Sequence, residues 1–121
     1  MNVLYVALGS ALGGVCRHLV SLALKAPKGF PWGTFAVNVA GALAIGLLSG
    51  ALAKGLGGAH AATIRLFAVV GFCGGFTTFS TFSNEAFRML ENAQWGQAAA
   101  YVGGSLLAGL AAVALGYLVS R

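Results

Sequence analysis

Hydrophobic residues form four long stretches along this chain, and short polar segments separate them. The stretches cover residues 3–24, 32–53, 61–87 and 98–119. Each contains roughly the 20 residues that an α-helix needs to cross the ~30 Å hydrocarbon core of a bilayer. The pattern therefore predicts an all-α membrane protein, in which a single domain, residues 1–121, consists of four transmembrane helices.

The composition supports a location in the lipid bilayer. Hydrophobic residues make up 59% of the chain and charged residues only 7%, whereas a soluble domain contains about 25% charged residues. The apolar pattern continues to the C-terminus, so the first stretch is interpreted as a permanent span and not as a cleaved signal peptide. The seven Lys and Arg residues are scattered, which argues against a nucleic-acid partner. The sequence contains neither a metal cluster nor a nucleophile–base pair, so no enzymatic activity is predicted.

Positive charge is balanced between the two sides of the predicted membrane protein. With four spans, both termini lie on one side. Three basic residues are expected on that side and three on the other: Lys54, Arg65 and Arg121 against Lys25, Lys28 and Arg88. Because a positive-inside bias is missing, we expect the chain to insert in both orientations and to pair as an antiparallel, dual-topology homodimer. The alternative is a single orientation that something other than loop charge determines.

The third stretch contains the strongest functional signal. Its sequence from 71 to 85 reads GFCGGFTTFSTFSNE. Gly74 and Gly75 weaken a helix, and Thr77 and Thr78 can form hydrogen bonds with their own backbone. We therefore expect this third helix to be broken in mid-membrane. Such a break would expose carbonyl oxygens, which suit a small hard cation such as sodium.

Two lines of side chains accompany the expected break. The first consists of Phe76, Phe79 and Phe82, and the second of Thr77, Thr81 and Glu85. The ring edges of phenylalanine are positive and can line a path for a small anion. The alternative for the first line is simple packing, and for Glu85 it is an ion pair with Arg88.

Polar residues also interrupt the other three spans: Arg17 in the first, Asn38 in the second, and Tyr101 and Ser105 in the fourth. Arg17 either snorkels to the interface or acts as a fixed cation at an anion vestibule. Asn38 either joins two helices or offers its amide N–H groups to a passing anion. Tyr101 either belongs to an interfacial aromatic belt or forms a track of hydroxyls with Ser105.

Glycines recur four residues apart in three of the stretches. The pairs are Gly9–Gly13, Gly46–Gly50 and Gly71–Gly75. Small residues at this spacing allow two membrane helices to approach closely. The glycine pairs therefore predict tight helix packing in these three spans.

Three segments carry motifs of a known family. GFCGGFTTFSTFSNE at 71–85, GTFAVNVAG at 33–41 and GGVCRH at 13–18 resemble the Fluc (CrcB-type) fluoride channels, and the resemblance covers essentially the whole chain. It implies an antiparallel dual-topology homodimer in the bacterial inner membrane. It also implies two fluoride pores and one structural sodium ion at the centre of the dimer.

The resemblance also assigns roles to individual residues. The fluoride pore would contain Asn38, Phe79, Ser80, Thr81, Phe82, Tyr101 and Ser105, the vestibule Arg17 and Glu85, and the sodium site the backbone carbonyls of Gly74 and Thr77. One position departs from the family pattern. Some members have a further serine four residues after Ser105, where this chain has Gly109.

The predicted function is passive, fluoride-selective conduction that exports fluoride from the cytoplasm. Hydrogen-bond donors and ring edges would replace the water around the ion, because stripping that water without replacement is prohibitive. The alternative is a small dual-topology multidrug or cation exporter. Such a transporter needs an acidic residue in mid-membrane, yet the first, second and fourth spans contain no Asp or Glu, and Glu85 lies late in the third.

Overall fold

Four long apolar helices account for most of the protein. The structure is a computed structural model that describes residues 2–24 and 30–121. The helices long and apolar enough to cross a membrane are α1 (Asn2–Ala23), α2 (Trp32–Ala53), the third span (Gly58–Glu91) and α6 (Trp95–Ser120). Within the described residues the chain forms no strand. The predicted all-α architecture with four spans is thus confirmed, and the expected turn residues Lys25 and Lys28 lie outside the described residues.

The third span is assembled from helical segments of different pitch. It begins with a 3-10 turn, η1 (Gly58–His60), and a short α-helix, α3 (Ala61–Ile64). A nine-residue π-helix, η2 (Arg65–Cys73), follows and continues into α4 (Gly74–Phe76). After two extended residues, α5 (Phe79–Glu91) completes the span.

The third and fourth spans are slightly longer than the hydrophobic pattern predicted, whereas α1 is shifted by one residue and α2 has the predicted bounds. α6 begins at Trp95 and not at residue 98, and the third span runs from Gly58 to Glu91 and not from 61 to 87. Hydropathy marks where apolar residues end, whereas a helix continues through polar residues as long as its backbone hydrogen bonds do. The ends of these helices therefore carry the polar residues that the sequence reading assigned to turns.

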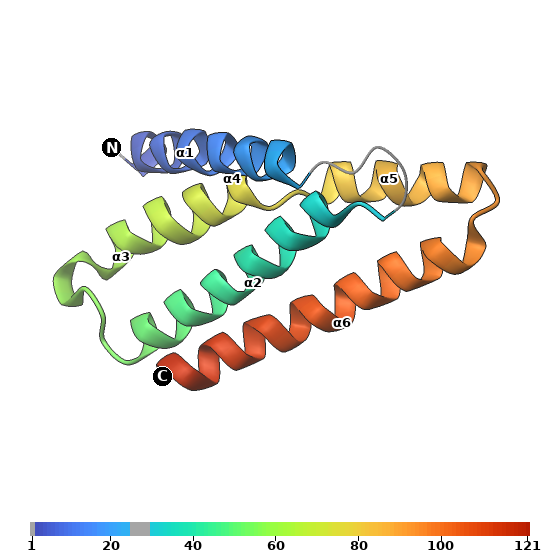
Figure 1. The fold of residues 1–121 in the computed structure, drawn as a ribbon. Helices are drawn as coiled ribbons and strands as arrows, with labels where there is room; N and C mark the ends of the chain where they lie inside the picture. The colour runs from blue at the N-terminus through green and yellow to red at the C-terminus, as the bar shows by residue number, and fades with distance from the viewer. Residues whose placement is uncertain (1, 25–29) are drawn as a thin grey trace.

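The four spans pack as two neighbouring pairs. α1 lies along η2 and α4, and α2 lies along α6 (Figure 1). α5 points away from α1, beyond the interruption, and contacts α6. Both termini lie at the same end of the molecule, as an even number of spans requires.

Glycine pairs allow these helices to touch through their backbones. A Cβ atom on Gly13 of α1 would collide with the carbonyl oxygen of Phe72, and one on Gly75 would collide with the backbone of Ser10. In the other pair of helices, a Cβ atom on Gly46 would meet the carbonyl oxygen of Val113. The close packing that the glycine spacing predicted is therefore confirmed, and it occurs within one chain.

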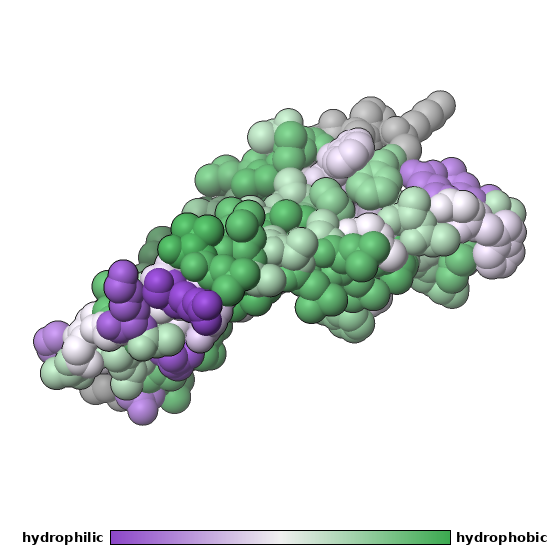
Figure 2. All heavy atoms as spheres, turned by 90° about the horizontal axis from the view of Figure 1, so that it is seen from below, coloured by the Kyte–Doolittle hydropathy of each residue, from purple (hydrophilic) through white to green (hydrophobic). Residues whose placement is uncertain are grey.

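The surface of the described residues is largely apolar between two polar ends. On α6, Leu107 is 72% exposed and Leu110 is 69% exposed. Figure 2 shows hydrophobic residues over the middle of the drawn face and hydrophilic residues toward its two ends. A belt of exposed apolar side chains between polar ends is the surface that a protein presents to lipid.

Candidate functional site

The helical backbone of the third span is interrupted at two threonines. Thr77 has φ -87° and ψ 157°, and Thr78 has φ -146° and ψ 125°, so both residues are extended. Before the interruption, the Cys73 carbonyl accepts two hydrogen bonds from Thr77, one from the backbone nitrogen at 3.0 Å and one from Oγ1 at 2.9 Å. Gly74 and Gly75, expected to weaken the helix, are themselves helical in α4. The threonines are therefore the residues that leave the helix.

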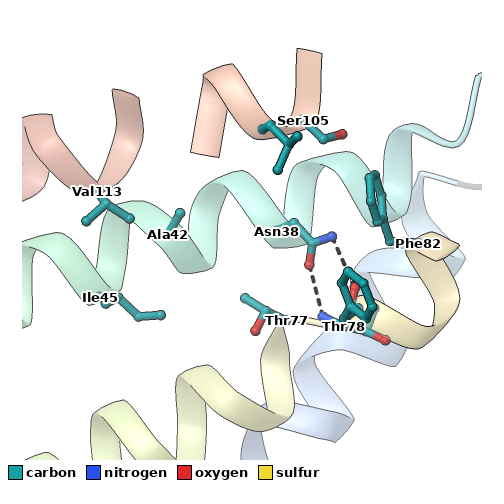
Figure 3. Close-up of a pocket in the computed structure, with 10 residues that line it drawn as sticks. Asn38, Ala42, Ile45, Thr77, Thr78, Phe82, Ser105 and Val113 are labelled. Atoms are coloured by element: carbon teal, nitrogen blue, oxygen red, sulfur yellow. Dashed lines mark hydrogen bonds between the residues drawn. The ribbon is translucent and has the colours of Figure 1, made fainter. Parts of the chain in front are cut away.

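Asn38 of α2 holds the second extended residue in place. Its Oδ1 atom accepts a hydrogen bond from the Thr78 nitrogen at 2.9 Å, and its Nδ2 atom donates to the Thr78 oxygen at 3.2 Å (Figure 3). A carboxamide matches the backbone N–H and C=O groups of one extended residue because it carries a donor and an acceptor side by side. Asn38 thus joins α2 to the third span, and one of its two N–H groups is already engaged.

The same contact changes the hydrogen bonding of Gly74. In an uninterrupted α-helix the Thr78 nitrogen would donate to the Gly74 oxygen, but here it donates to Asn38. The Gly74 oxygen therefore lacks the helical hydrogen bond from Thr78 that an uninterrupted α-helix would supply. Among residues 2–24 and 30–121, no three His, Cys, Asp or Glu side chains are grouped so that they could hold a metal ion.

Thr78 also begins the following helix. Its Oγ1 atom accepts a hydrogen bond from the Thr81 nitrogen at 3.3 Å, which is an N-cap contact for α5. Its hydroxyl lies 3.3 Å from the hydroxyl of Thr81 and donates to it. Ser80 and Thr81 are exposed on the outer side of α5, so within one chain they do not line the cavity described next.

A cavity of about 320 Å³ lies beside the interruption and is open on one side. Its polar lining comes from three elements: Asn38 of α2, Thr77 and Thr78 of the interruption, and Ser105 of α6. The rest of the lining is apolar and consists of Ala42, Ile45, Phe79, Phe82, Leu106 and Val113. Figure 3 shows these side chains around the cavity, with Asn38 and the threonines at one end and Val113 and Ile45 at the other.

Ser105 has an unusual position in this cavity. Its hydroxyl oxygen is buried and has no hydrogen-bond partner among the described residues. Buried polar atoms are nearly always paired, so this hydroxyl is an exception in a residue that lines the cavity. The sequence predicted that Ser105 and Tyr101 could form a track of hydroxyls. In the structure Ser105 lines the cavity, whereas Tyr101 does not.

Two phenylalanines after the interruption lie side by side, whereas the third one faces elsewhere. The ring centroids of Phe79 and Phe82 are 6.3 Å apart, and both rings line the cavity. Phe76 stacks instead on Phe72 with centroids 5.8 Å apart. The prediction that Phe76 shares their helical face is wrong, because the extended residues separate α4 from α5. For the same reason Thr77 does not continue a helical line with Thr81 and Glu85.

Tyr101 forms the centre of a small buried cluster beside the cavity. It is 0% exposed, and its hydroxyl donates to Oε1 of Glu85 at 3.1 Å. Its ring packs on Phe82 and Phe30, with centroids 4.9 Å and 5.2 Å away. A fully buried tyrosine does not belong to an aromatic belt facing the membrane interface, so that alternative is excluded. Glu85 of α5 thus accepts a hydrogen bond from Tyr101 of α6.

Arg17 reaches across from α1 to the end of α4. Its Nε atom donates to the carbonyl oxygen of Gly75 at 3.2 Å, and the side chain is half-buried. The guanidinium therefore has a protein partner close to the interruption and does not simply extend toward water.

The sequence of this chain matches one known protein family over almost its full length. A family described as "CrcB-like protein, Camphor Resistance (CrcB)" matches residues 4–117, which is nearly the entire chain. The chain belongs to the CrcB family. The resemblance inferred from the motifs is thereby confirmed.

Several curated CrcB relatives are similar over their full length. A protein of Methylobacterium nodulans is 48% identical over 122 residues, which cover 100% of this chain and 97% of the relative. A protein of Sphingopyxis alaskensis is 47% identical over 125 residues, with the same two coverages. A third, from Agrobacterium fabrum, is 44% identical over 124 residues. All three are named "Fluoride-specific ion channel FluC".

Membership of the CrcB family and four apolar spans make this chain a multi-pass protein of the bacterial inner membrane.

Two residues that hold the site together were not among the predicted site residues. Thr78 accepts or donates most of the hydrogen bonds around the interruption, and Gly75 receives the Arg17 side chain. A threonine three residues before another polar helix position is an N-cap signal that could have identified Thr78.

Proposed function

We propose that this protein is a fluoride-selective, passive ion channel that exports fluoride from the cytoplasm. The observation that carries the proposal is the full-length similarity to curated CrcB relatives named as fluoride-specific ion channels. The channel works as an antiparallel homodimer with two pores and one structural sodium ion. A channel carries out no chemical turnover, so the protein is not an enzyme.

The open cavity supports a second copy as the missing wall. Asn38, Thr77, Thr78 and Ser105 contribute polar groups to a cavity that is open on one side. Most of these groups are hydrogen-bonded within the chain, but the second N–H group of Asn38 is not. Because an unsatisfied polar group in hydrocarbon costs several kcal/mol, it favours a further protein surface over the open side. A copy inserted in the opposite orientation provides that cover, and the balanced loop charge favours both orientations equally.

Fluoride must exchange its hydration shell for protein contacts inside such a pore. Ser105 offers an unpaired hydroxyl, and Asn38 has one N–H group beyond the one bound to Thr78. The ring edges of Phe79 and Phe82 add weaker positive contacts along the same wall. Binding has to remain weak enough for the ion to leave again.

The remaining hydroxyls of the pore lie next to this wall. Ser80 and Thr81 are exposed on α5, where a second copy can approach them. Tyr101 is held by Glu85, so its oxygen has a fixed position one layer behind Phe82. We assign Ser80 and Thr81 to the fluoride path, completed by the partner copy, whereas Tyr101, whose only hydroxyl hydrogen is bonded to Glu85, borders that path behind Phe82.

In this proposal the interruption of the third span lies in mid-membrane and binds sodium. The carbonyl oxygens of Gly74 and Thr77 are the donors, because the Thr78 nitrogen is withdrawn from Gly74 by Asn38. One chain supplies too few oxygens for a sodium ion, whereas two interruptions related by the dimer axis supply twice as many. Sodium contributes fixed positive charge and joins the two copies.

Charge and membrane potential determine the direction of transport. Arg17 and Glu85 are assigned to the vestibule of the path, and the positive charge of Arg17 raises the local concentration of anions. An inside-negative potential drives an anion outward with about 2.3 kcal/mol per 100 mV. Fluoride that enters the cell as neutral HF is thus expelled passively.

Ion efflux from liposomes that contain the purified protein tests the proposal. Potassium fluoride is trapped inside, valinomycin clamps the potential, and an electrode measures the released fluoride. We expect rapid release of fluoride and retention of chloride under the same conditions. Folded protein that releases no fluoride would refute the channel, and proton-driven efflux of an organic cation would favour an exporter instead.

Phe82→Ile provides the sharpest test of the pore wall. Isoleucine keeps apolar volume but removes the positive ring edge, so fluoride efflux should fall by about two orders of magnitude, roughly the effect of losing 2–3 kcal/mol of ion stabilisation. Phe87→Ile is the matched control, because Phe87 lies on the same helix, is 58% exposed and does not line the cavity. Size-exclusion chromatography verifies that both variants assemble; unchanged efflux in Phe82→Ile would remove the ring-edge role.

A further inference from the structure

The end of α4 is a helix C-terminus within the third apolar span. The last carbonyls of a helix lack N–H partners from the following turn, and they carry the negative end of the helix dipole. Here this end arises where Thr77 and Thr78 leave the helix, on a span that is otherwise apolar. Such an end needs donors or positive charge in a membrane, because water is not freely available to it.

Two of the three carbonyl oxygens near this helix end accept hydrogen bonds from nearby donors. The Cys73 oxygen receives the backbone nitrogen and the hydroxyl of Thr77. The Gly75 oxygen receives Nε of Arg17 at 3.2 Å. The Gly74 oxygen, between them, has lost the Thr78 nitrogen to Asn38. Arg17 is thus the only donor in this set that also brings a full charge.

We propose that Arg17 is a positioning residue that caps this internal helix end and holds the interruption in its extended geometry. Its charge is permanent, and its Nε hydrogen bond fixes the Gly75 carbonyl next to the Gly74 carbonyl that we assign to sodium. The cap itself requires only the described contacts. If the proposed sodium site exists, which rests on the proposed function, two cations would balance the partial negative charge of this helix end. One is the guanidinium of Arg17 and the other is the bound sodium ion.

The neighbours of Arg17 fit a cap better than an exposed vestibule charge alone. Arg17 is half-buried, whereas the adjacent His18 is exposed. α1 approaches this part of the third span through Gly13, where a Cβ atom would collide with the Phe72 carbonyl. That close approach brings Arg17, one turn further along α1, within reach of Gly75.

Cys73 provides a built-in reporter of the cap. Its side chain is 1% exposed and precedes Gly75 by two residues, so loosening of the helix end should open it to a small uncharged thiol reagent. The experiment uses the full-length protein in liposomes with Cys16→Ser as background, because Cys16 is the other free cysteine. The labelling rate of Cys73 by N-ethylmaleimide is measured by mass spectrometry.

Arg17→Gln should raise the labelling rate about tenfold, since loss of a charge-assisted hydrogen bond favours opening by that factor. Arg17→Lys keeps the charge without the Nε donor and should give an intermediate rate. His18→Gln is the matched control and should match the background. Equal rates for Arg17→Gln and the background, or for Arg17→Lys and Arg17→Gln, would overturn the cap. If Arg17→Gln does not fold, Arg17→Lys decides: a faster rate supports the cap and an unchanged rate overturns it.

Sodium titration separates the cap from the proposed channel. If sodium is the second cation, raising its concentration should slow Cys73 labelling more in Arg17→Gln than in the background. Faster labelling in Arg17→Gln without any response to sodium would support the cap and count against the sodium site. Fluoride efflux of the same samples reports separately on the channel, because labelling requires no ion conduction.

Discussion

Asn38 carries out a task that requires both polar groups of its side chain. It gives the backbone N–H of Thr78 an acceptor and the backbone C=O of Thr78 a donor, so an extended residue within an apolar span keeps its backbone hydrogen bonds. The sequence identified Asn38 as a buried amide that needs partners. The partner lies 40 residues away, and no local pattern records a contact over that separation.

Replacing Asn38 by Asp tests this contact. Aspartate cannot donate to the Thr78 carbonyl, and when ionised it places a negative charge beside it. We expect a free energy of unfolding lower by ~1–3 kcal/mol and fluoride efflux at least about tenfold slower. Thermal unfolding in detergent and liposome efflux measure the two effects. Asn84→Asp, at an exposed position of α5, is the control, and normal efflux in Asn38→Asp would contradict the assigned role.

Some of the residues that the sequence predicted for the pore lie together in the structure. Asn38, Phe79, Phe82 and Ser105 were all named from the sequence, and they line one cavity. Their roles in a fluoride pore stay a prediction until efflux is measured. Phe76 was wrongly grouped with the other rings, because its assignment assumed that helical periodicity continues through the threonines.

At the scale of elements, η2 shows what periodicity cannot reveal. Its sequence, RLFAVVGFC, is apolar after Arg65 and would suit an α-helix equally well. The π-helix packs along α1, where Ser10 Oγ donates to the Gly71 carbonyl at 3.3 Å. π-Helical turns are rare and depend on their surroundings, so the sequence of this segment alone did not predict its pitch.

Gly13 and Gly14 offer a paired test of helix packing. A Cβ atom on Gly13 would collide with the Phe72 carbonyl, whereas one on Gly14 meets nothing within 4 Å. Gly13→Ala should force α1 away from η2 and lower the free energy of unfolding by ~1–3 kcal/mol. Gly14→Ala should leave it unchanged or raise it by up to about 1 kcal/mol through helix propensity. Thermal unfolding of both variants decides, and equal stabilities would refute the packing role of Gly13.

For the whole molecule, the arrangement of spans leaves one polar cavity incomplete. The four helices pack as two pairs, and the cavity between α2, the interruption and α6 remains open on one side. In a single chain, the open side of this cavity would face hydrocarbon, where the second N–H group of Asn38 has no partner. Assembly with an oppositely inserted copy is the prediction that belongs to this scale.

Orientation in the membrane can be measured directly at the turn after α5. Asn92 is exposed there and precedes α6. In Asn92→Cys with the Cys16→Ser background, each of the two orientations therefore presents the new thiol on a different side of the membrane. With balanced loop charges, a membrane-impermeant maleimide should label about half of the protein from outside the cell and the rest only after lysis. The background without the added cysteine is the control. Labelling from one side only would contradict dual topology.

The sequence by itself determined the four apolar spans, the membrane location and the family, because hydropathy and contiguous motifs are local properties of the chain. Only the tertiary structure decided which polar groups meet. It set Asn38 against Thr78, Arg17 against Gly75, and Tyr101 against Glu85. Each pair joins two different helices, and its geometry depends on how closely those helices pack and on where the third span leaves its helix.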